Sequence, residues 1–338
     1  MTAVTLNFYG IRVRVEGESA LTARIEGEFG YFIADESVAP IFRIRVHPKF
    51  ERTQNWRKLF RTKWSTLYLS KGKERRVCFF NKAWVAYRFE AGECDVYCDE
   101  APTSFEVVYL VVLSYVGEEL DRRGLHRVHG MGLCRDGRGI LFLGTSGVGK
   151  STLAIEFLKE HSSRILSDDT PLVEESGGMM AFPQRIALKE MPSLNPQHVK
   201  RFKRTEFGEK FVIASSYFRD RVQPSVLTDA VVYLTREGND SIEIKSLTRA
   251  ELFVLLLRWL VIGHETPQVW QLYLRFSPLS VWWKSRILVS RLRCAWAISR
   301  RSRPWKVNLA EDAERSADQL KTWISNGTLE TRVPGEIL

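Results

Sequence analysis

One stretch of this sequence has the residue types and the spacing of a phosphate-binding loop. Residues 144–151 read Gly-Thr-Ser-Gly-Val-Gly-Lys-Ser and fill every fixed position of the pattern G-x-x-x-x-G-K-[ST]. Glycines in this pattern let backbone N–H groups converge on the β-phosphate, the lysine reaches the β- and γ-phosphates, and the last hydroxyl binds Mg²⁺. We therefore predict that Mg-ATP binds here; the alternative is an ordinary glycine-rich turn. The predicted nucleotide-binding residues are Gly144, Thr145, Ser146, Gly147, Val148, Gly149, Lys150, Ser151 and Thr152.

Two adjacent carboxylates could complete a phosphoryl-transfer site. Asp168 and Asp169 follow the short apolar run at 164–167. Phosphoryl transfer needs one acidic group to hold the metal and another to accept the proton of the attacking hydroxyl. Successive side chains at the end of an extended strand point in opposite directions, so the two aspartates should have different roles. The alternative is a simple turn or helix cap, because Thr170 and Pro171 come next.

The elements that would position these residues follow from the hydrophobic pattern. Residues 139–143 predict a short buried strand that leads into the loop, and apolar residues at helical spacing predict a helix that begins at Lys150. Asp136 and Gly137 lie between two apolar runs, which is typical of a β-hairpin. This hairpin would make His129 a neighbour of the strand that leads into the loop.

The rest of the chain divides into a strand-rich first part and a helical last part. A helix is predicted at 104–119, and a hairpin is predicted at 172–182. Strands are predicted at 4–15, 31–33, 41–46, 67–69, 76–80, 84–89, 186–189, 211–213, 230–234 and 241–244. Further helices are predicted at 250–261, 269–276, 281–298 and 311–324. We therefore expect an α/β (α+β) fold with a strand-rich domain at 1–103, a nucleotide-binding core at 104–245 and a helical region at 246–338 packed on the core.

Composition is ordinary for a globular protein, with 44% hydrophobic and 27% charged residues and a formal net charge of +10. The first residues lack a basic region followed by an apolar run, so we expect no signal peptide. The apolar stretch 252–262 is too short to span a bilayer and contains Arg258. The odd number of cysteines and the absence of a C-x-x-C pair favour free thiols in a reducing cytoplasm. The cysteines are Cys78, Cys94, Cys98, Cys134 and Cys294.

Two basic stretches with interleaved aromatic residues lie at 47–76 and 275–306. Either could bind an anionic partner such as a nucleic acid or a membrane surface. Solvated loops and basic helix faces have the same composition, and we favour that interpretation for both stretches. The sequence therefore gives no firm nucleic-acid signal and no transmembrane segment, and it leaves a homo-oligomer possible.

The central block resembles the bacterial HPr serine kinase/phosphorylase family, whose nucleotide-binding fold is related to phosphoenolpyruvate carboxykinase. The resemblance is carried by His129-Gly130, the predicted hairpin, the loop at 144–151 and Leu166-Ser167-Asp168-Asp169, and it is best over residues 125–190. Thr152 stands where the family usually has glutamate, and its second, glycine-rich signature is not found. The sequence is therefore more similar to divergent HPr-kinase-related proteins found in biosynthetic gene neighbourhoods.

The resemblance implies a role for each matched residue. His129 would lie near the transferred phosphoryl group, and Lys150 and Ser151 would serve ATP and Mg²⁺. Asp168 would be the catalytic base, and Asp169 would sit on the metal side beside Ser151. We expect a cytoplasmic, ATP-dependent kinase that phosphorylates a serine-type hydroxyl of a peptide, protein or small molecule. The alternative is a nucleotide-gated ATPase or regulatory module that binds nucleic acid or a protein; a carboxykinase would need a second metal site and a substrate-binding arginine that the sequence does not reveal.

Overall fold

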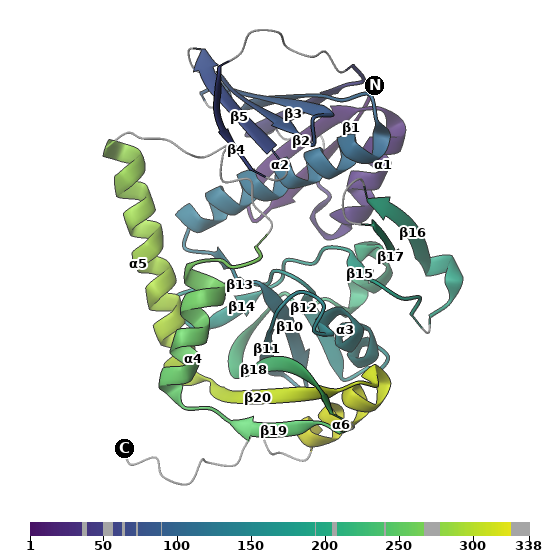
Figure 1. The fold of residues 1–338 in the computed structure, drawn as a ribbon, viewed down its shortest axis with the longest axis vertical. Helices are drawn as coiled ribbons and strands as arrows, with labels where there is room; N and C mark the ends of the chain where they lie inside the picture. Colours follow the sequence, from purple (N-terminus) through teal and green to yellow (C-terminus); the bar gives the residue numbers. More distant parts are fainter. Residues whose placement is uncertain are drawn as a thin grey trace. The chain divides into compact units, whose positions relative to one another are not determined.

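The computed structural model describes residues 1–35, 39–49, 57–62, 65–71, 74–88, 90–192, 194–204, 208–239, 241–266 and 278–325. These residues form two compact units (Figure 1). Unit 1 comprises Met1–Glu119 and Asn195–Tyr217, and unit 2 comprises Leu120–Leu194, Phe218–Thr266 and Pro278–Leu338. The units are interleaved along the sequence.

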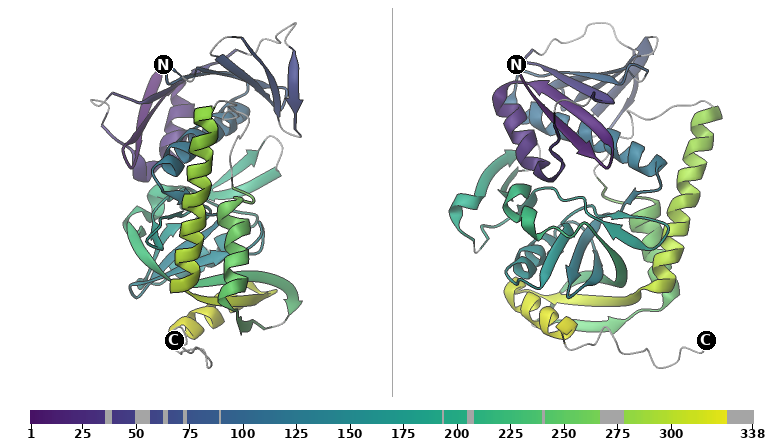
Figure 2. Two further views of the ribbon diagram at one scale, coloured as in Figure 1. Left: turned by 90° about the vertical axis from the view of Figure 1, so that its left-hand side faces the viewer. Right: turned by 180° about the vertical axis from the view of Figure 1, so that it is seen from behind.

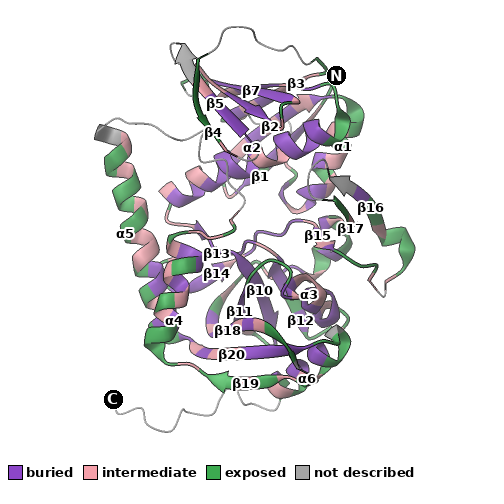
Figure 3. Cartoon of the chain, in the orientation of Figure 1, coloured by how far each residue is buried: buried purple, intermediate pink, exposed green. Residues whose placement is uncertain are grey.

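Unit 1 is built on an eight-stranded sheet in the order β1-β2-β3-β8-β7-β6-β5-β4. Alternating side chains of β2 and β3 are buried, and helices α1 and α2 cover one face of the sheet (Figure 3). Phe42 on β3 stacks on Tyr115 of α2, with ring centroids 3.9 Å apart. The elements are β1 (Thr2–Phe8), β2 (Ile11–Gly17), α1 (Ser19–Glu28), η1 (Gly30–Phe32), β3 (Phe42–His47), β4 (Lys58–Arg61), β5 (Ser65–Lys71), β6 (Glu74–Phe79), β7 (Ala83–Arg88), β8 (Glu93–Tyr97) and α2 (Ala101–Arg122), with η2 (Pro196–His198), β16 (Val199–Arg204) and β17 (Gly208–Ile213) later in the chain.

Most strands predicted in this unit are confirmed, with one correction. Residues 31–33 were predicted as a strand, but Gly30–Phe32 form a short 3-10 helix, η1. Phe32 is buried and packs tilted on Phe8, with ring centroids 4.5 Å apart. A three-residue apolar run indicates burial but does not distinguish a strand from a helical turn, which explains the error. Helix α1 and strands β4, β8 and β16 were not predicted.

Unit 2 has a central sheet in which β11, β18 and β20 run parallel to one another. β10 pairs antiparallel with both β11 and β12, and the start of β18 continues through β14 and β13 to β9. The strands are β9 (His126–Arg127), β10 (Gly130–Arg135), β11 (Arg138–Leu143), β12 (Ser163–Ser167), β13 (Leu172–Val173), β14 (Gly178–Met180), β15 (Ile186–Leu188), β18 (Ser225–Asn239), β19 (Glu243–Ser246) and β20 (Arg303–Ala310). This arrangement brings the ends of β11 and β12 to the same region, where the predicted site residues lie.

The helices of unit 2 are α3 (Lys150–Leu158), α4 (Arg249–Leu256), α5 (Pro278–Arg301) and α6 (Ala313–Ser325), with a short 3-10 segment, η3 (Ser215–Arg221), that begins in unit 1. Helices α4 and α5 run side by side, as Figure 2 shows, and bury Leu252 of α4 and Ile298 of α5 in the core against the sheet. Helix α4 continues into a π-helical turn, η4, at Leu257–Val261. The first half of α5 is mostly exposed (Figure 3). Helix α3 packs on α6 and on β12.

The region at 246–338, predicted to be helical, contains a strand of the central sheet. β20 lies between β18 and β19, and its Val307 and Leu309 are fully buried. The sequence placed the start of this segment in the basic stretch 275–306 because it contains Arg303 and Lys306. It is a strand because it pairs with β18 and β19, which the local sequence could not reveal. The predicted helix at 269–276 lies outside the described residues, as does part of the basic stretch 47–76. The division into functional domains at 103/104 and 245/246 stays a prediction.

Two further expectations concern the state of the cysteines and the presence of membrane-spanning helices. All five cysteines are free, as predicted, and all five are buried. Among the described helices, none combines the length and the apolar character that a bilayer crossing requires.

Candidate functional site

The predicted loop joins the end of β11 to the start of α3, as the sequence pattern indicated. Gly144 has φ 154°, and a Cβ there would lie 2.9 Å from the carbonyl oxygen of Leu234 on the parallel strand β18. Gly149 caps α3 with φ 120°, and a Cβ there would lie 3.0 Å from Nη2 of Arg236. At Gly144 a Cβ would collide with the backbone of β18, and the positive φ at both positions is one that residues other than glycine rarely adopt, so both positions favour glycine.

Lys150 is the first residue of α3 and is folded back into the loop. Its side chain is buried, and Nζ donates to the carbonyl oxygens of Gly144 at 2.5 Å and Thr145 at 3.2 Å. Nζ also lies 3.2 Å from Nε2 of His129. Burial lowers the pKa of Lys150 below its ordinary value, and the charges of nearby carboxylates oppose this shift. The ammonium is thus a desolvated cation, which a phosphate group would stabilise.

Asp168 and Asp169 follow β12 and point to different partners, as the sequence predicted for adjacent residues at a strand end. Asp168 is buried, and its Oδ2 accepts a hydrogen bond from Oγ of Ser151 at 2.7 Å. Asp169 is 41% exposed, and its Oδ1 lies 3.1 Å from Nδ1 of His129. The expected position of Asp169 beside Ser151 is therefore corrected, because Ser151 pairs with Asp168. The turn is closed from within by Ser167, whose Oγ accepts from the backbone N–H of Thr170 at 3.1 Å.

His129 is held between the loop and the aspartates by the predicted hairpin. β10 pairs with β11 so that Gly130 lies opposite Leu143, the last strand residue before the loop. Asp136 and Gly137 turn the hairpin with φ values of 50° and 79°. The imidazole packs on the indole of the buried Trp259, with ring centroids 5.7 Å apart. The prediction that His129 is a neighbour of the strand leading into the loop is confirmed.

A carboxylate from a distant part of the chain also contacts the loop. Oε2 of Glu265 accepts a hydrogen bond from the backbone N–H of Ser146 at 2.7 Å and lies 3.4 Å from Nε2 of His129. Glu265 has φ 62°, a left-handed conformation that few residues other than glycine adopt. Its carboxylate accepts the hydrogen bond of the Ser146 N–H, which belongs to the group of loop N–H groups that could bind a phosphate oxygen. Nothing in the local sequence around Glu265 signals this contact, because it depends on residues far away in the chain.

Arg236 is a second residue that the sequence did not single out. It lies on β18, the parallel neighbour of β11, and its guanidinium is close to Gly149. The carboxyl ends of adjacent parallel strands form the usual binding region of an α/β sheet. Arg236 follows the apolar strand residues 230–234, and this position near the end of a buried strand was the sequence signal that could have identified it.

The donors at this site suit a magnesium ion bound together with a nucleotide. Mg²⁺ is usually held by one or two carboxylates and substrate phosphates, and it keeps several waters. Ser151 Oγ and the Asp168 carboxylate lie together at the start of α3 and fit that pattern. In the part of the chain that the structure describes, no group of three or more His, Cys, Asp or Glu side chains could hold a metal by itself. The side chains therefore fit a metal shared with phosphates rather than an all-protein metal cage.

Comparison with known proteins gives little support for any particular function of this chain. No family model matches the chain, and no curated protein matches it. Among solved structures, the chain is similar to the HPr(Ser) kinase/phosphatase from Coxiella burnetii, with 18% identity and a TM-score of 0.23. The matched region covers 36% of this chain and 76% of that chain. A superposition at this score transfers no residue role to this chain.

Proposed function

We propose that this protein is an ATP-dependent kinase that transfers the γ-phosphoryl group of Mg-ATP to a serine-type hydroxyl. The observation that carries the proposal is the pair Asp168 and Asp169, which points one carboxylate at Ser151 and the other at His129 beside Lys150. A phosphate-binding loop alone would serve any nucleotide-binding protein. Two carboxylates with separate partners next to such a loop supply what transfer to a hydroxyl also requires.

The loop would bind the phosphates of ATP. Backbone N–H groups of residues 144–151 and the N-terminus of α3 face an anion favourably, and Lys150 would exchange its carbonyl contacts for phosphate oxygens. Ser151 and Asp168 would hold Mg²⁺, which neutralises charge on the phosphates when it is bound. Arg236 would face the same phosphates from β18.

Asp169 would accept the proton of the acceptor hydroxyl. It is the more exposed of the two aspartates, so an incoming hydroxyl can reach it, whereas Asp168 is buried beside Ser151. The hydroxyl oxygen forms a bond to the γ-phosphorus, the bond from that phosphorus to the β,γ-bridging oxygen breaks, and ADP leaves. The hydroxyl proton passes to the carboxylate of Asp169, which His129 orients. This assignment reverses the two roles that the family resemblance implies.

Conservative substitutions of the two aspartates test the proposal. We expect Asp169→Asn to keep Mg-ATP affinity and to lower transfer by roughly a hundredfold or more, because it keeps the shape and loses the base. Asp168→Asn should weaken the Mg²⁺ dependence of nucleotide binding. Asp136→Asn is the control, since Asp136 is 65% exposed in a hairpin turn where asparagine is equally favourable.

The measurements are nucleotide affinity with and without Mg²⁺ and transfer of label from γ-labelled ATP to a pool of serine-containing peptides and small hydroxyl compounds. If Asp168→Asn loses transfer while Asp169→Asn retains it, the roles implied by the resemblance are right. Normal transfer in both variants refutes the kinase mechanism. Nucleotide binding and hydrolysis without transfer to any acceptor would favour the nucleotide-gated ATPase or regulatory module instead.

A further inference from the structure

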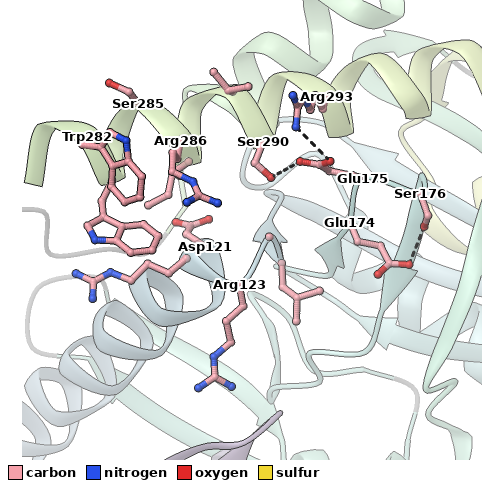
Figure 4. Close-up of a pocket in the computed structure, with 16 residues that line it drawn as sticks. Asp121, Arg123, Glu174, Glu175, Ser176, Trp282, Ser285, Arg286, Ser290 and Arg293 are labelled. Atoms are coloured by element: carbon pink, nitrogen blue, oxygen red, sulfur yellow. Dashed lines mark hydrogen bonds and ion pairs between the residues drawn. The ribbon is translucent and has the colours of Figure 1, made fainter. Parts of the chain in front are cut away.

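A second site in unit 2 is a pocket of about 770 Å³ beside helix α5 (Figure 4). Three segments of unit 2 line it: residues 121–125 at the end of α2 and in the turn after it, which belong to unit 2, the turn between β13 and β14, and residues 282–293 of α5. It has no residue in common with the phosphate-binding loop. Its lining includes Asp121, Arg122, Glu175, Trp282, Trp283, Arg286 and Ser290.

A hydrogen-bonded chain runs from the buried pair Asp121 and His126 to Ser290 and the exposed Glu175 beside this pocket. Nδ1 of His126 lies 2.8 Å from Oδ1 of Asp121, and Nε2 lies 2.9 Å from Oγ of Ser290. Although burial of Asp121 acts in the opposite direction, Arg291 and His126 hold the pKa of its carboxyl below the ordinary value. Ser290 donates its proton to Oε1 of Glu175 at 2.8 Å. The arrangement looks like that of a serine hydrolase, but this proton points to Glu175 and away from the imidazole, so Ser290 is a structural link and not a nucleophile.

On the α5 side, Arg286 and the indole rings of Trp282 and Trp283 line the pocket, whereas the carboxylates of the lining come from the other two segments. The guanidinium of Arg286 lies 4.9 Å from the ring centroid of Trp282 and 5.3 Å from that of Trp283. Arg122 lies 5.9 Å from the ring of Trp283 on the other side of the pocket. Among the described residues, no carboxylate lies within ion-pair distance of Arg286, whereas Glu175 is occupied by Ser290 and Arg293. This wall would therefore attract a carboxylate whose carbon atoms can pack against indole.

The pocket and the candidate phosphoryl-transfer site lie at two ends of one β-ribbon. β9 pairs with β13, and Val173 lies opposite His126. The segments that follow β9 and precede β13 bring Nδ1 of His129 and Oδ1 of Asp169 to 3.1 Å. Asp169 is five residues before Glu174, a pocket residue, and His129 is four residues after Leu125, another pocket residue. At about 3.3 Å per extended residue, the separation is roughly 13–17 Å. A small hydroxyl compound cannot span that distance, whereas about four or five residues of extended polypeptide can.

We propose that this pocket binds an acidic side chain of a polypeptide acceptor, about four or five residues from the serine that receives the phosphoryl group. The proposal rests on the proposed function for the position of that serine. It makes the acceptor a polypeptide rather than a small molecule, and it assigns Arg286 to acceptor affinity. Trp282 and Trp283 cover the bound side chain and weaken competition from water for the Arg286 guanidinium.

The test is binding of fluorescently labelled twelve-residue peptides, measured by anisotropy without nucleotide, to the full-length chain. Each peptide has one central serine with either glutamates or lysines four and five positions away on both sides. We expect the acidic peptide to bind at least tenfold more tightly than the basic one, and Arg286→Glu to reduce its affinity about tenfold or more. Arg300→Glu is the matched control: Arg300 is on the same helix and lies over an indole, 5.8 Å from the ring of Trp296, but it is not in the pocket. It should change affinity less than twofold.

The same peptides then serve as acceptors with γ-labelled ATP, so that failure of this proposal can be told from failure of the proposed function. A higher KM for the acidic peptide in Arg286→Glu with little change in kcat supports the pocket as an acceptor site. Equal binding of acidic and basic peptides, or binding that Arg286→Glu leaves unchanged, overturns the proposal even if transfer occurs. If the acidic peptide binds through Arg286 and no acceptor is phosphorylated, the proposed function fails and the acceptor role fails with it.

Discussion

Removing the charge of Glu265 should tighten nucleotide binding. In the structure, its carboxylate accepts the N–H of Ser146 at 2.7 Å and faces His129 at 3.4 Å. A phosphate group bound by the loop would have to displace this carboxylate or sit beside it. Glu265→Gln keeps the size of the side chain and removes only the negative charge.

The size of the effect follows from the geometry. Two unit charges about 4 Å apart repel by about 4 kcal/mol at an effective dielectric constant of 20 and by about 1 kcal/mol in water. The Glu265 side chain is 30% exposed, so the lower part of that range applies. A penalty of about 1–2 kcal/mol corresponds to roughly a 5- to 30-fold increase in Mg-ATP affinity for Glu265→Gln.

Isothermal titration of Mg-ATP into the wild type and the variant measures this change. Glu243→Gln is a suitable control, because Glu243 is an exposed carboxylate on β19 away from the loop. Weaker binding by Glu265→Gln would show that the carboxylate favours the bound nucleotide, for example through the metal. Affinity unchanged within twofold would show that bound phosphate does not use the Ser146 N–H, and the reasoning would be wrong.

Three further substitutions probe separate parts of the structure. Ser151→Ala removes a proposed Mg²⁺ ligand, so the gain in ATP affinity on adding Mg²⁺ should shrink at least fivefold in titrations; an unchanged gain would contradict that role. Asp121→Asn should lower the free energy of unfolding in urea by about 3–5 kcal/mol at pH 7, since it removes one partner of a buried ion pair. The pKa of the Asp121 carboxyl is lower in the folded protein than its ordinary value, so its ionisation stabilises the fold at pH values above the ordinary pKa, and this stabilisation is lost as the pH falls through the folded-state pKa. The difference in unfolding free energy between Asp121→Asn and the wild type should therefore narrow below about pH 4; a difference that stays constant with pH would contradict this role of the Asp121 charge. Gly139→Ala places a Cβ 2.1 Å from the carbonyl oxygen of Leu227 and should lower the free energy of unfolding in urea by at least about 1–3 kcal/mol. Gly27→Ala is the control, because a Cβ there meets no atom within 4 Å and should not lower it; equal unfolding free energies of the two variants would refute the clash.

The parts of the site that could be predicted from the sequence depend on local patterns. The strand, loop and helix at 138–158 follow one another directly, and the hairpin at Asp136 and Gly137 is set by the turn residues themselves. Alternation at a strand end also predicted that Asp168 and Asp169 diverge. It could not predict which one reaches Ser151, because that depends on the rotation of β12 relative to α3 and on tertiary packing.

The parts that could not be predicted are contacts between distant segments. Glu265 reaches Ser146 across 119 residues, and Ser290 reaches His126 across 164 residues. β20 is a strand because β18 and β19 flank it, although its own start is basic. In each case the local residues fit a solvated face equally well, and only the fold supplies the partner.

The most direct test of the account is the affinity of Mg-ATP for the wild type and for Lys150→Ala. The account predicts that the wild type binds one nucleotide per chain. Because hydrogen bonds to charged groups contribute about 1.5–3 kcal/mol, Lys150→Ala should weaken binding by roughly 10- to 150-fold. Lys159→Ala is the matched control, since Lys159 follows the same helix and is 36% exposed, and it should bind as the wild type does. No measurable Mg-ATP binding by the wild type, or equal affinity in wild type and Lys150→Ala, would contradict nucleotide binding at residues 144–152.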